Sequence, residues 1–302
     1  MTTHAIGVDL GGTKIKACLV TGDGEIVGRE TRPTVDDGGR GWVSAVAATV
    51  EALSLGHEDR PAVGLAAPGI ASSDGRCIAV MPGRLAGLEG FDWSEAVGTP
   101  VAVLNDAHAF VAGEAWLGAA RDEATVVGLT LGTGVGGGVL IDGRLFVGRD
   151  GRAGHLGHIS LDPEGGLDIT NTPGSLEDAI GEHSLSSRSG GRFATTADLV
   201  EAVRTADGQA TEVWSRSVRA LAAAVASLIN IFSPESLVIG GGIASAGETL
   251  FEPLRMRLDE IEWRPFGRVT PVRPAELGTW AGAVGAAREA MHKNLKTSDS
   301  EP

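Results

Sequence analysis

The chain has 302 residues, of which 42% are hydrophobic and 21% are charged, so it can bury a large core and is expected to form about two domains. A formal net charge of −14, without a local cluster of lysine and arginine, disfavours binding to nucleic acid or to an anionic membrane. Two cysteines, Cys18 and Cys77, are too few for a disulfide framework or a cysteine metal site, and the start has no secretory pattern, so we expect a cytoplasmic protein.

The first half of the chain predicts strands that alternate with helices. Apolar runs bounded by turn residues predict strands over 6–10, 14–20, 25–32, 62–67, 77–80 and 101–104. Helical spacing of apolar residues predicts helices over 41–56 and 107–117.

The second half begins with the same order of elements. Strands are predicted over 125–131, 136–141 and 144–147, followed by an irregular stretch over 148–174 that is rich in glycine, histidine and proline. Further strands are predicted over 236–239 and 268–273. Helices are predicted over 176–180, 197–204, 211–231, 248–261 and 280–292.

This alternation in both halves predicts an α/β fold with a mixed sheet in each of two domains. We expect a small domain over 1–118, on which the last helix, 280–292, packs back, and a large domain over 119–279. Residues 293–302 are expected to be a disordered tail.

One short pattern occurs twice and is the most informative feature of the chain. Asp9-Leu10-Gly11-Gly12-Thr13-Lys14 and Thr130-Leu131-Gly132-Thr133-Gly134 each follow an apolar strand and precede a second strand, a turn and a third strand. The backbone amides of such a hairpin can hold phosphate oxygens. Either loop alone could be no more than a tight hairpin, but two copies in register predict a nucleotide cleft between two related halves.

Other glycine motifs are weaker. Residues 132–137 match GxGxxG, but a strand follows them where a dinucleotide-binding fold needs a helix, and the chain has no P-loop sequence. A third cluster, Gly240-Gly241-Gly242, lies between a predicted strand and a predicted helix. At such a turn, a base or a ribose can approach the backbone closely.

A carboxylate stands at the end of another strand. Asn105 and Asp106 close the apolar strand 101–104 and open the helix that starts at Ala107. They are equally well interpreted as an ordinary helix N-cap or as a catalytic base with a neighbouring amide that orients an attacking alcohol. Both interpretations can hold at once.

Five motifs, in this order and spacing, resemble the ROK family of sugar kinases. The motifs are Asp9-Leu10-Gly11-Gly12-Thr13-Lys14, Asn105-Asp106-Ala107, Leu131-Gly132-Thr133-Gly134-Val135-Gly136-Gly137, Gly157-His158-Ile159 and Ile239-Gly240-Gly241-Gly242-Ile243. The family includes bacterial glucokinases, fructokinases and N-acetylhexosamine kinases, and it belongs to the actin-like ATPase superfamily. The resemblance covers essentially the whole chain and implies Mg·ATP as the phosphoryl donor and a sugar hydroxyl as the acceptor.

The resemblance implies a role for each matching position. Asp106 would be the general base, and Asp9 would lie near Mg²⁺, through water. The ATP phosphates would contact Gly11, Gly12, Thr13, Lys14, Thr133 and Gly134. The adenosine would contact Gly240, Gly241 and Gly242, and the sugar would contact Asn105, Asp106, His158 and Glu177.

Two of these sugar ligands have simpler interpretations. His158 matches the histidine of the family's E-x-G-H element, but it could be a loop histidine that bonds to the backbone. Glu177 matches the glutamate that closes the family's cysteine-rich element, but it could be an acid placed in the first turn of a helix by the helix dipole.

The chain also departs from the family pattern. Asp168, Thr170 and Ser175 stand where the family has its three zinc cysteines, so no structural zinc is expected and the loop must be ordered by packing and hydrogen bonds. His155 replaces the glutamate of E-x-G-H, and Arg84 aligns loosely with a family asparagine. Both could contact the sugar, and imidazole reads hydroxyl groups differently from a carboxylate, so the resemblance does not identify the sugar.

We therefore predict an ATP-dependent carbohydrate kinase, in dimeric or larger homo-oligomers, with no nucleic-acid or membrane partner. One alternative is a catalytically retired family member that binds sugar as a regulator; too few residues precede the first strand for the DNA-binding module of the family's repressors, so a DNA-binding regulator is not expected. A second alternative is an actin-like ATPase that acts on a protein partner.

Overall fold

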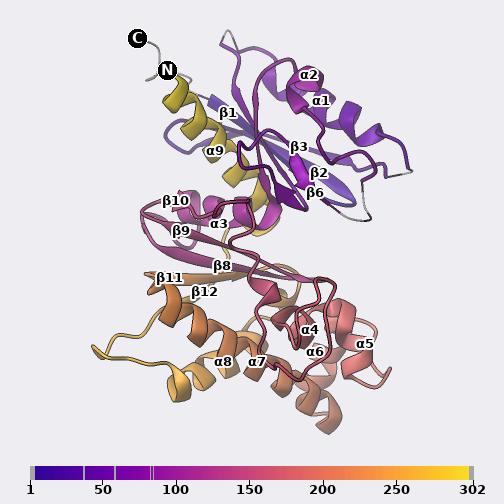
Figure 1. Ribbon diagram of the computed structural model, residues 1–302, viewed down its shortest axis with the longest axis vertical. Helices are drawn as coiled ribbons and strands as arrows, with labels where there is room; N and C mark the ends of the chain where they lie inside the picture. The colour runs from indigo at the N-terminus through magenta and orange to yellow at the C-terminus, as the bar shows by residue number, and fades with distance from the viewer. Residues whose placement is uncertain (1–3, 37, 58, 82, 84, 299–302) are drawn as a thin grey trace. The chain divides into compact units, whose positions relative to one another are not determined.

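The computed structural model describes residues 4–36, 38–57, 59–81, 83 and 85–298, with side chains as far as Lys293 (Figure 1). The chain forms two compact units. Unit 1 comprises Met1–Asp122, Leu145–Ala153 and Glu276–Pro302, and unit 2 comprises Glu123–Arg144 and Gly154–Ala275. The predicted domain limits near residues 118 and 279 fall close to two of the crossings between the units, and they stay a prediction.

Unit 1 contains a five-stranded sheet in the order β3-β2-β1-β4-β7 and a small two-stranded sheet, β5-β6. The strands of unit 1 are β1 (His4–Leu10), β2 (Lys14–Thr21), β3 (Ile26–Pro33), β4 (Ala62–Ala67), β5 (Ile70–Ala71), β6 (Ile78–Val80) and β7 (Val101–Asn105). Its helices are α1 (Gly41–Ser54), α2 (Trp93–Val97), α3 (Asp106–Leu117), the short turn η4 (Gly278–Trp280) and α9 (Ala281–Ser298). Strand β1 is antiparallel to β2 and parallel to β4, so the sheet is mixed.

Glycines let α9 approach the sheet of unit 1 at backbone distance. A Cβ atom on Gly7 of β1 or on Gly64 of β4 would overlap a main-chain carbonyl oxygen of α9. A Cβ atom on Gly285 of α9 would overlap the carbonyl oxygen of Ala109 in α3. The C-terminal helix therefore fills one face of this sheet together with α3, while α1 contacts β1, β2 and β3 and places Trp42 in a separate apolar cluster with Trp93.

Unit 2 contains the second five-stranded sheet, in the order β10-β9-β8-β11-β12. Its strands are β8 (Val126–Leu131), β9 (Val135–Ile141), β10 (Arg144–Leu145), β11 (Ser236–Gly240) and β12 (Val272–Pro274). Its helices are α4 (Leu176–Ile180), α5 (Leu185–Arg188), α6 (Thr196–Arg204), α7 (Gly208–Phe232) and α8 (Glu248–Ile261), with short 3₁₀ turns η1 (Leu156–His158), η2 (Glu182–Ser184) and η3 (Ile243–Ala246).

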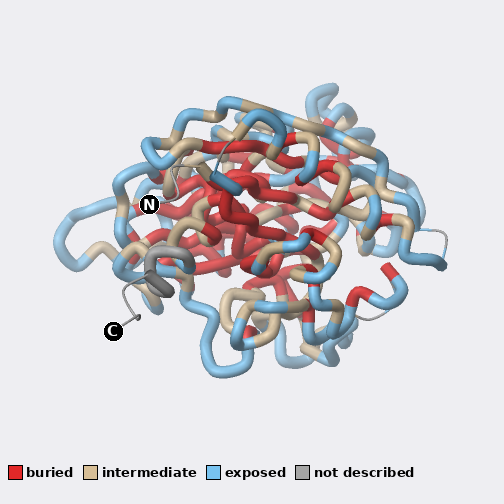
Figure 2. The backbone as a smooth tube through the Cα atoms, turned by 90° about the horizontal axis from the view of Figure 1, so that it is seen from above, coloured by how far each residue is buried: buried red, intermediate tan, exposed pale blue. Residues whose placement is uncertain are grey.

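The two sheets share one topology. In each, the first strand pairs antiparallel with the second and parallel with a strand from later in the chain, which itself pairs parallel with the last strand. Buried residues concentrate in the central strands (Figure 2). The prediction of an α/β protein with a mixed sheet in each half is confirmed, and the repeated hairpins connect equivalent strands of the two sheets.

The core of unit 2 is one large apolar cluster to which α7 contributes along most of its length. By length and composition alone, α7 is the one helix among the described residues that could cross a bilayer, but half of its most apolar window is buried inside the protein. A buried core helix passes the same test, so this is weak support for a membrane segment.

Several boundaries differ from the sequence prediction. The strand predicted over 268–273 is the shorter β12 (Val272–Pro274), and the one predicted over 144–147 is β10 (Arg144–Leu145). Helix α9 continues to Ser298, beyond the predicted end at residue 292, because residues 293–298 include two lysines and a leucine but no glycine or proline to end it. Helices α2 and α5 were missed because each spans too few residues to show a helical period.

Candidate functional site

The first group of predicted residues lies at one edge of the unit 1 sheet. Strands β1, β4 and β7 are parallel, so their carboxyl ends meet at this edge, where Asp9 lies near the end of β1 and Asn105 ends β7. Asp106 is the first residue of α3, and its side chain is exposed. The topology thus brings the predicted general base and the predicted magnesium-binding carboxylate to the same edge.

Asn105 holds this edge together. Its Oδ1 atom accepts hydrogen bonds from the amides of Ala107 (2.9 Å) and His108 (3.1 Å), and its Nδ2 atom donates to the carbonyl oxygen of Gly69 (2.9 Å). The helix-cap interpretation of Asn105 is therefore observed. The second role, contact with a sugar, stays a prediction.

The carboxyl group of Asp9 has a raised pKa. Burial of its carboxyl group and the neighbouring charge of Asp106 raise its pKa to about 7, against the opposing effect of Lys16. A carboxyl group whose pKa is raised by a neighbouring carboxylate is a favourable setting for a divalent cation, which removes the repulsion.

The first hairpin, between β1 and β2, is closed by its own backbone. The amide of Gly11 donates to the carbonyl oxygen of Lys14 (3.1 Å), and Thr34 anchors the loop through its hydroxyl group, which donates to the Gly11 carbonyl (2.7 Å). Gly11 and Gly12 are partly buried, whereas Thr13 and Lys14 are exposed. The side chain of Lys14 is therefore accessible to solvent at the start of β2.

The second hairpin, between β8 and β9, is held from outside. The amide of Gly132 donates to the carbonyl oxygen of Gly134 (2.9 Å), and the amides of Glu182 and His183 donate to the carbonyls of Gly132 and Thr133 (both 3.0 Å). The Oε2 atom of Glu177 accepts from the amide of Val135 (2.8 Å).

A pocket of about 700 Å³ joins this hairpin to the third glycine cluster. Gly132 and Thr133 line it on one side, and Gly242 and Ile243 line it on another. Its walls continue along α6 and the preceding turn, with Glu182, Asp198, Glu201 and Arg204 among them. The size is that of a small-molecule site, and two loops that were predicted separately to bind phosphate and adenosine share one cavity.

Gly241 has to be glycine at this turn. Its φ is +90°, and a Cβ atom there would overlap the carbonyl oxygen of Leu131 at the end of β8. The turn after β11 therefore lies directly against the strand that leads into the second hairpin.

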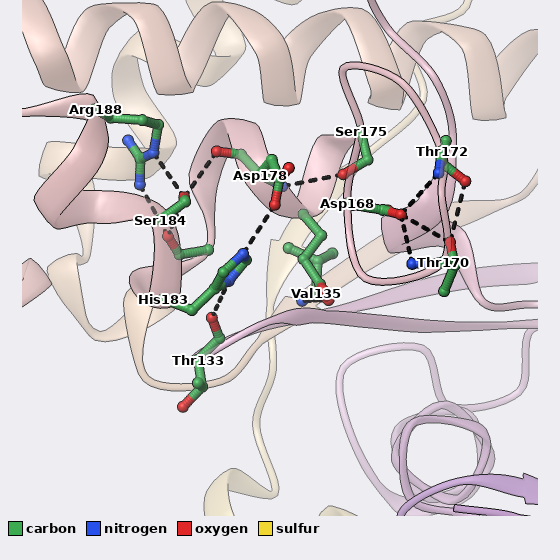
Figure 3. A network of polar contacts seen from close by, with 12 residues as sticks. Thr133, Val135, Asp168, Thr170, Thr172, Ser175, Asp178, His183, Ser184 and Arg188 are labelled. Carbon is green, nitrogen blue, oxygen red and sulfur yellow. Dashed lines mark hydrogen bonds and ion pairs between the residues drawn. The ribbon is translucent and has the colours of Figure 1, made fainter. Parts of the chain in front are cut away.

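The loop that contains Asp168, Thr170 and Ser175 is ordered by hydrogen bonds. Asp168 Oδ1 accepts from the amides of Thr170 (2.8 Å) and Thr172 (2.9 Å) and from the Thr170 hydroxyl (2.8 Å), and Asp168 Oδ2 contacts His158 Nδ1 at 2.8 Å (Figure 3 shows the Asp168, Thr170 and Thr172 part). Ser175 caps α4 by accepting from the amide of Asp178. A carboxylate and two hydroxyls engaged in this way do not make a zinc site; the expected absence of zinc stays a prediction.

These bonds also set the state of Asp168. Burial by itself would raise the pKa of this carboxyl, but hydrogen bonds from His158, Thr172 and Thr170 outweigh it and hold the pKa below the ordinary value. Asp168 is thus an anion that fixes His158 through Nδ1. The opposite ring nitrogen, Nε2, is then an acceptor in the neutral ring, suited to a sugar hydroxyl.

Three of the predicted sugar-contacting residues remain, namely His155, Glu177 and Arg84. His155 is partly buried directly before η1, so it lies one turn from His158. Glu177 is in the first turn of α4, as its simpler interpretation requires, but its carboxylate also bonds to the second hairpin. Arg84 lies outside the described residues.

The sequence interpretation missed His183 and the role of Asp168. Asp168 could have been found, because an aspartate followed by threonine two residues later is typical of a turn closed by the carboxylate. His183 gave no signal, since its contact with Thr133 joins segments 50 residues apart in the chain.

The chain is similar to known proteins over nearly its whole length. The sequence profile of the ROK family matches residues 5–293. The chain belongs to the ROK family. Its resemblance to that family, inferred from five motifs, is confirmed.

Relatives and solved structures extend this ROK assignment. The glucokinase of Thermotoga maritima is 37% identical over 93% of this chain and 95% of its own length. A ROK hexokinase from Thermus thermophilus has 31% identity and a TM-score of 0.84 over 98% of this chain and 100% of that one. A ROK glucokinase from Streptomyces griseus, solved with glucose and AMPPNP, has 32% identity and a TM-score of 0.78 over 96% and 99%. The actin-like fold expected from the resemblance is confirmed.

Proposed function

We propose that this ROK protein is an ATP-dependent carbohydrate kinase that transfers the γ-phosphoryl group to a hydroxyl of a hexose or a related sugar. The observation that carries the proposal is the pocket that the second glycine hairpin and the turn after β11 share. The similarity to glucokinases and to a glucokinase solved with glucose and AMPPNP supports it.

The nucleotide would bind with its adenosine in this pocket, by Gly240, Gly241 and Gly242. Its phosphates would contact Thr133 and Gly134 of the second hairpin and Gly11, Gly12, Thr13 and Lys14 of the first. The amides of Gly11 and Gly132 donate within their own hairpins, so the amides that follow them in each loop would hold the anion.

Asp9 fits a magnesium ion, because Mg²⁺ is held through one or two carboxylates together with substrate phosphates. Asp9 would hold it through water. When bound, the ion would neutralise charge on the transferred phosphoryl group.

Asp106 would act as the general base and accept the proton of the attacking hydroxyl. It is the first residue of α3, directly after a strand end, and it is exposed, as a base that meets a substrate must be. Asn105, His158 and Glu177 would contact sugar hydroxyls, and His155 and Arg84 could do so where the chain departs from the family pattern. The sugar itself is a question for experiment.

The wider assignments are proposals of the same kind. Units 1 and 2 would be the small and large domains, and closure on the substrates would exclude water from the reaction. The protein would act in the cytoplasm as a homodimer or larger homo-oligomer, without a nucleic-acid or membrane partner, consistent with its net charge of −14.

The direct test measures ADP formation against a panel of hexoses, amino sugars and polyols, with wild-type protein and with the Asp106→Ala and Asp106→Asn variants. We expect one or a few sugars to stimulate turnover. Loss of the base should lower kcat by about 10² to 10⁴, because general-base catalysis contributes about that factor. Binding of AMPPNP, measured by calorimetry, should be retained.

Other outcomes distinguish the alternatives. Sugar binding without ADP formation would support a retired enzyme that acts as a regulator. ATP hydrolysis that no sugar stimulates would support an ATPase with a protein partner. Full turnover in Asp106→Asn would remove Asp106 from the mechanism.

A further inference from the structure

His183 lies between two hydrogen-bond acceptors at the second hairpin. Its Nδ1 atom is 2.9 Å from the carbonyl oxygen of Thr133, and its Nε2 atom is 2.9 Å from Oδ1 of Asp178 (Figure 3). Its own amide also donates to the Thr133 carbonyl, at 3.0 Å. The side chain of His183 therefore connects the tip of the hairpin to the short helix α4.

Both partners can only accept. A carbonyl oxygen carries no proton, and an ionised carboxylate carries none either, so each contact needs an N–H group on the ring. Neutral imidazole has a single N–H group and can satisfy one of them. The imidazolium form satisfies both, and it places a positive charge beside the hairpin.

The surroundings favour this charged form. Burial tends to lower the pKa of His183, but hydrogen bonds to Thr133 and Asp178 and the negative charges of Glu177 and Asp178 outweigh it, so the pKa is raised. Arg188 of α5 is the nearby cation; it donates to the Gly181 carbonyl and to Ser184, while Glu182 accepts from the amide of Thr196.

Glu177 ties the same helix to the other side of the hairpin. Its Oε2 atom accepts from the amide of Val135, and a Cβ atom on Gly134 would overlap the same carboxylate. Helix α4 is thus connected to the hairpin at two points. Asp178 contacts His183, which contacts the Thr133 carbonyl, and Glu177 accepts from the Val135 amide. Gly134 lies between these two anchors.

We propose that His183, as an imidazolium oriented by Asp178, is a positioning residue for ATP. It fixes the Thr133 carbonyl on the α4 side, so that the amides of Thr133 and Gly134 are presented to the phosphates. The inference rests on the proposed function, since it assumes that this hairpin contacts ATP. It also gives α4 two roles, because this helix carries the predicted sugar ligand Glu177 and, through Asp178, supports the hairpin that would contact the phosphates.

Two amide variants separate the two contacts. In His183→Asn, the amide nitrogen takes the place of Nδ1 and can still donate to Thr133, but the contact with Asp178 is lost. In His183→Gln, the amide nitrogen takes the place of Nε2 and can still donate to Asp178, but the contact with Thr133 is lost. The two variants are similar in size and polarity, so each serves as the control for the other.

The readout is the dissociation constant of AMPPNP by calorimetry, together with KM for ATP and KM for the sugar. We expect His183→Gln to weaken AMPPNP binding and to raise KM for ATP about tenfold, the effect of losing one charge-assisted hydrogen bond. KM for the sugar should change less than about twofold, and His183→Asn should recover part of the loss, because it keeps the Thr133 contact but lacks the charge and the Asp178 contact. In the wild type, AMPPNP binding should weaken as pH rises through the His183 pKa, whereas in His183→Asn this component should be absent.

Equal AMPPNP affinity in wild type and His183→Gln would overturn the inference. So would equal losses in both variants that follow their loss of stability in urea, because that pattern indicates a purely structural role. Since AMPPNP binding is measured without turnover, a failure of the kinase proposal would show separately, as the absence of sugar-dependent ADP formation in the wild type.

Discussion

At the scale of one residue, the carboxyl group of Asp9 opposes folding once it is ionised. Its carboxyl is partly buried beside Asp106, and its pKa is raised to about 7. At neutral pH and above, the folded protein without a cation must therefore hold a charge that the unfolded chain holds more easily. Such a cost is typical of a site that is shaped for a ligand.

The sign of the pH dependence follows from this shift. Below about pH 4, Asp9 is protonated in both states and contributes no penalty. As pH rises from about 4 to about 7, the unfolded state releases the proton first, so the free energy of unfolding decreases over this window. Above about pH 7 the penalty is complete.

We predict that Asp9→Asn is more stable than wild type at pH 8 in EDTA, by on the order of 1–3 kcal/mol, and that the difference disappears toward pH 4. Urea unfolding at a series of pH values measures it. Asp150→Asn, at an exposed position, is the control and should leave the pH dependence unchanged. A variant Asp9→Asn that is less stable than wild type at pH 8 would contradict the interpretation.

At the scale of elements, Glu114 of α3 fastens two other segments of unit 1. Its side chain is fully buried. Oε2 accepts from the amides of Ala119 (2.9 Å) and Glu276 (3.1 Å), and Oε1 accepts from the amide of Leu277 (2.9 Å). Residues 119 and 276 lie close to points where the chain crosses between the units. The Glu114 carboxylate therefore bonds to the chain near two of the four points where it crosses between the units.

We predict that Glu114→Gln lowers the free energy of unfolding by about 2–4 kcal/mol, because an amide group would place a donor against backbone donors and leave them unsatisfied. Thermal or urea unfolding measures the change. Glu51→Gln, at an exposed position on α1, should change stability by less than about 0.5 kcal/mol. Similar stability of the two variants would show that the buried carboxylate is replaceable.

At the scale of the whole molecule, neither unit is one continuous piece of chain. Unit 1 is completed by Glu276–Pro302, and α9 from this segment supplies Ala283, Val284 and Ala287 to an apolar cluster with strands β1 and β4 and their neighbours. The N-terminal sheet therefore packs against a segment from more than 170 residues later in the chain than β7.

We predict that a chain ending at Ala275 does not form a stable unit 1, because the sheet face that α9 covers would be exposed. Hydrogen exchange should then show loss of protection in β1, β2 and β4. A chain ending at Ser298 is the control and should keep wild-type protection. Full protection of β1 in the shorter chain would show that the first sheet folds without α9.

The local pattern of the chain was enough to predict much of this protein. The two glycine hairpins, the strands before them and the α/β alternation depend on short-range periodicity and turn chemistry, which neighbouring residues determine. The five motifs resembled those of the ROK family, and the family profile confirmed that resemblance. Short elements such as α2 and α5, and the end of α9, were missed because a few residues carry no period and helix ends depend on packing.

Tertiary structure alone decided how the site is supported. Whether Asn105 also bonds to Gly69, whether Glu177 bonds to a hairpin and whether the Asp9 pKa is raised all depend on which distant segments come close to these side chains. His183 makes the point most clearly, since its ring contacts a carbonyl 50 residues earlier in the chain and that contact helps to raise its pKa. The sequence determined most of the elements and pointed to the loops that we propose bind phosphate; folding determined which side chains hold those loops, because burial and hydrogen bonding are properties of contacts between segments.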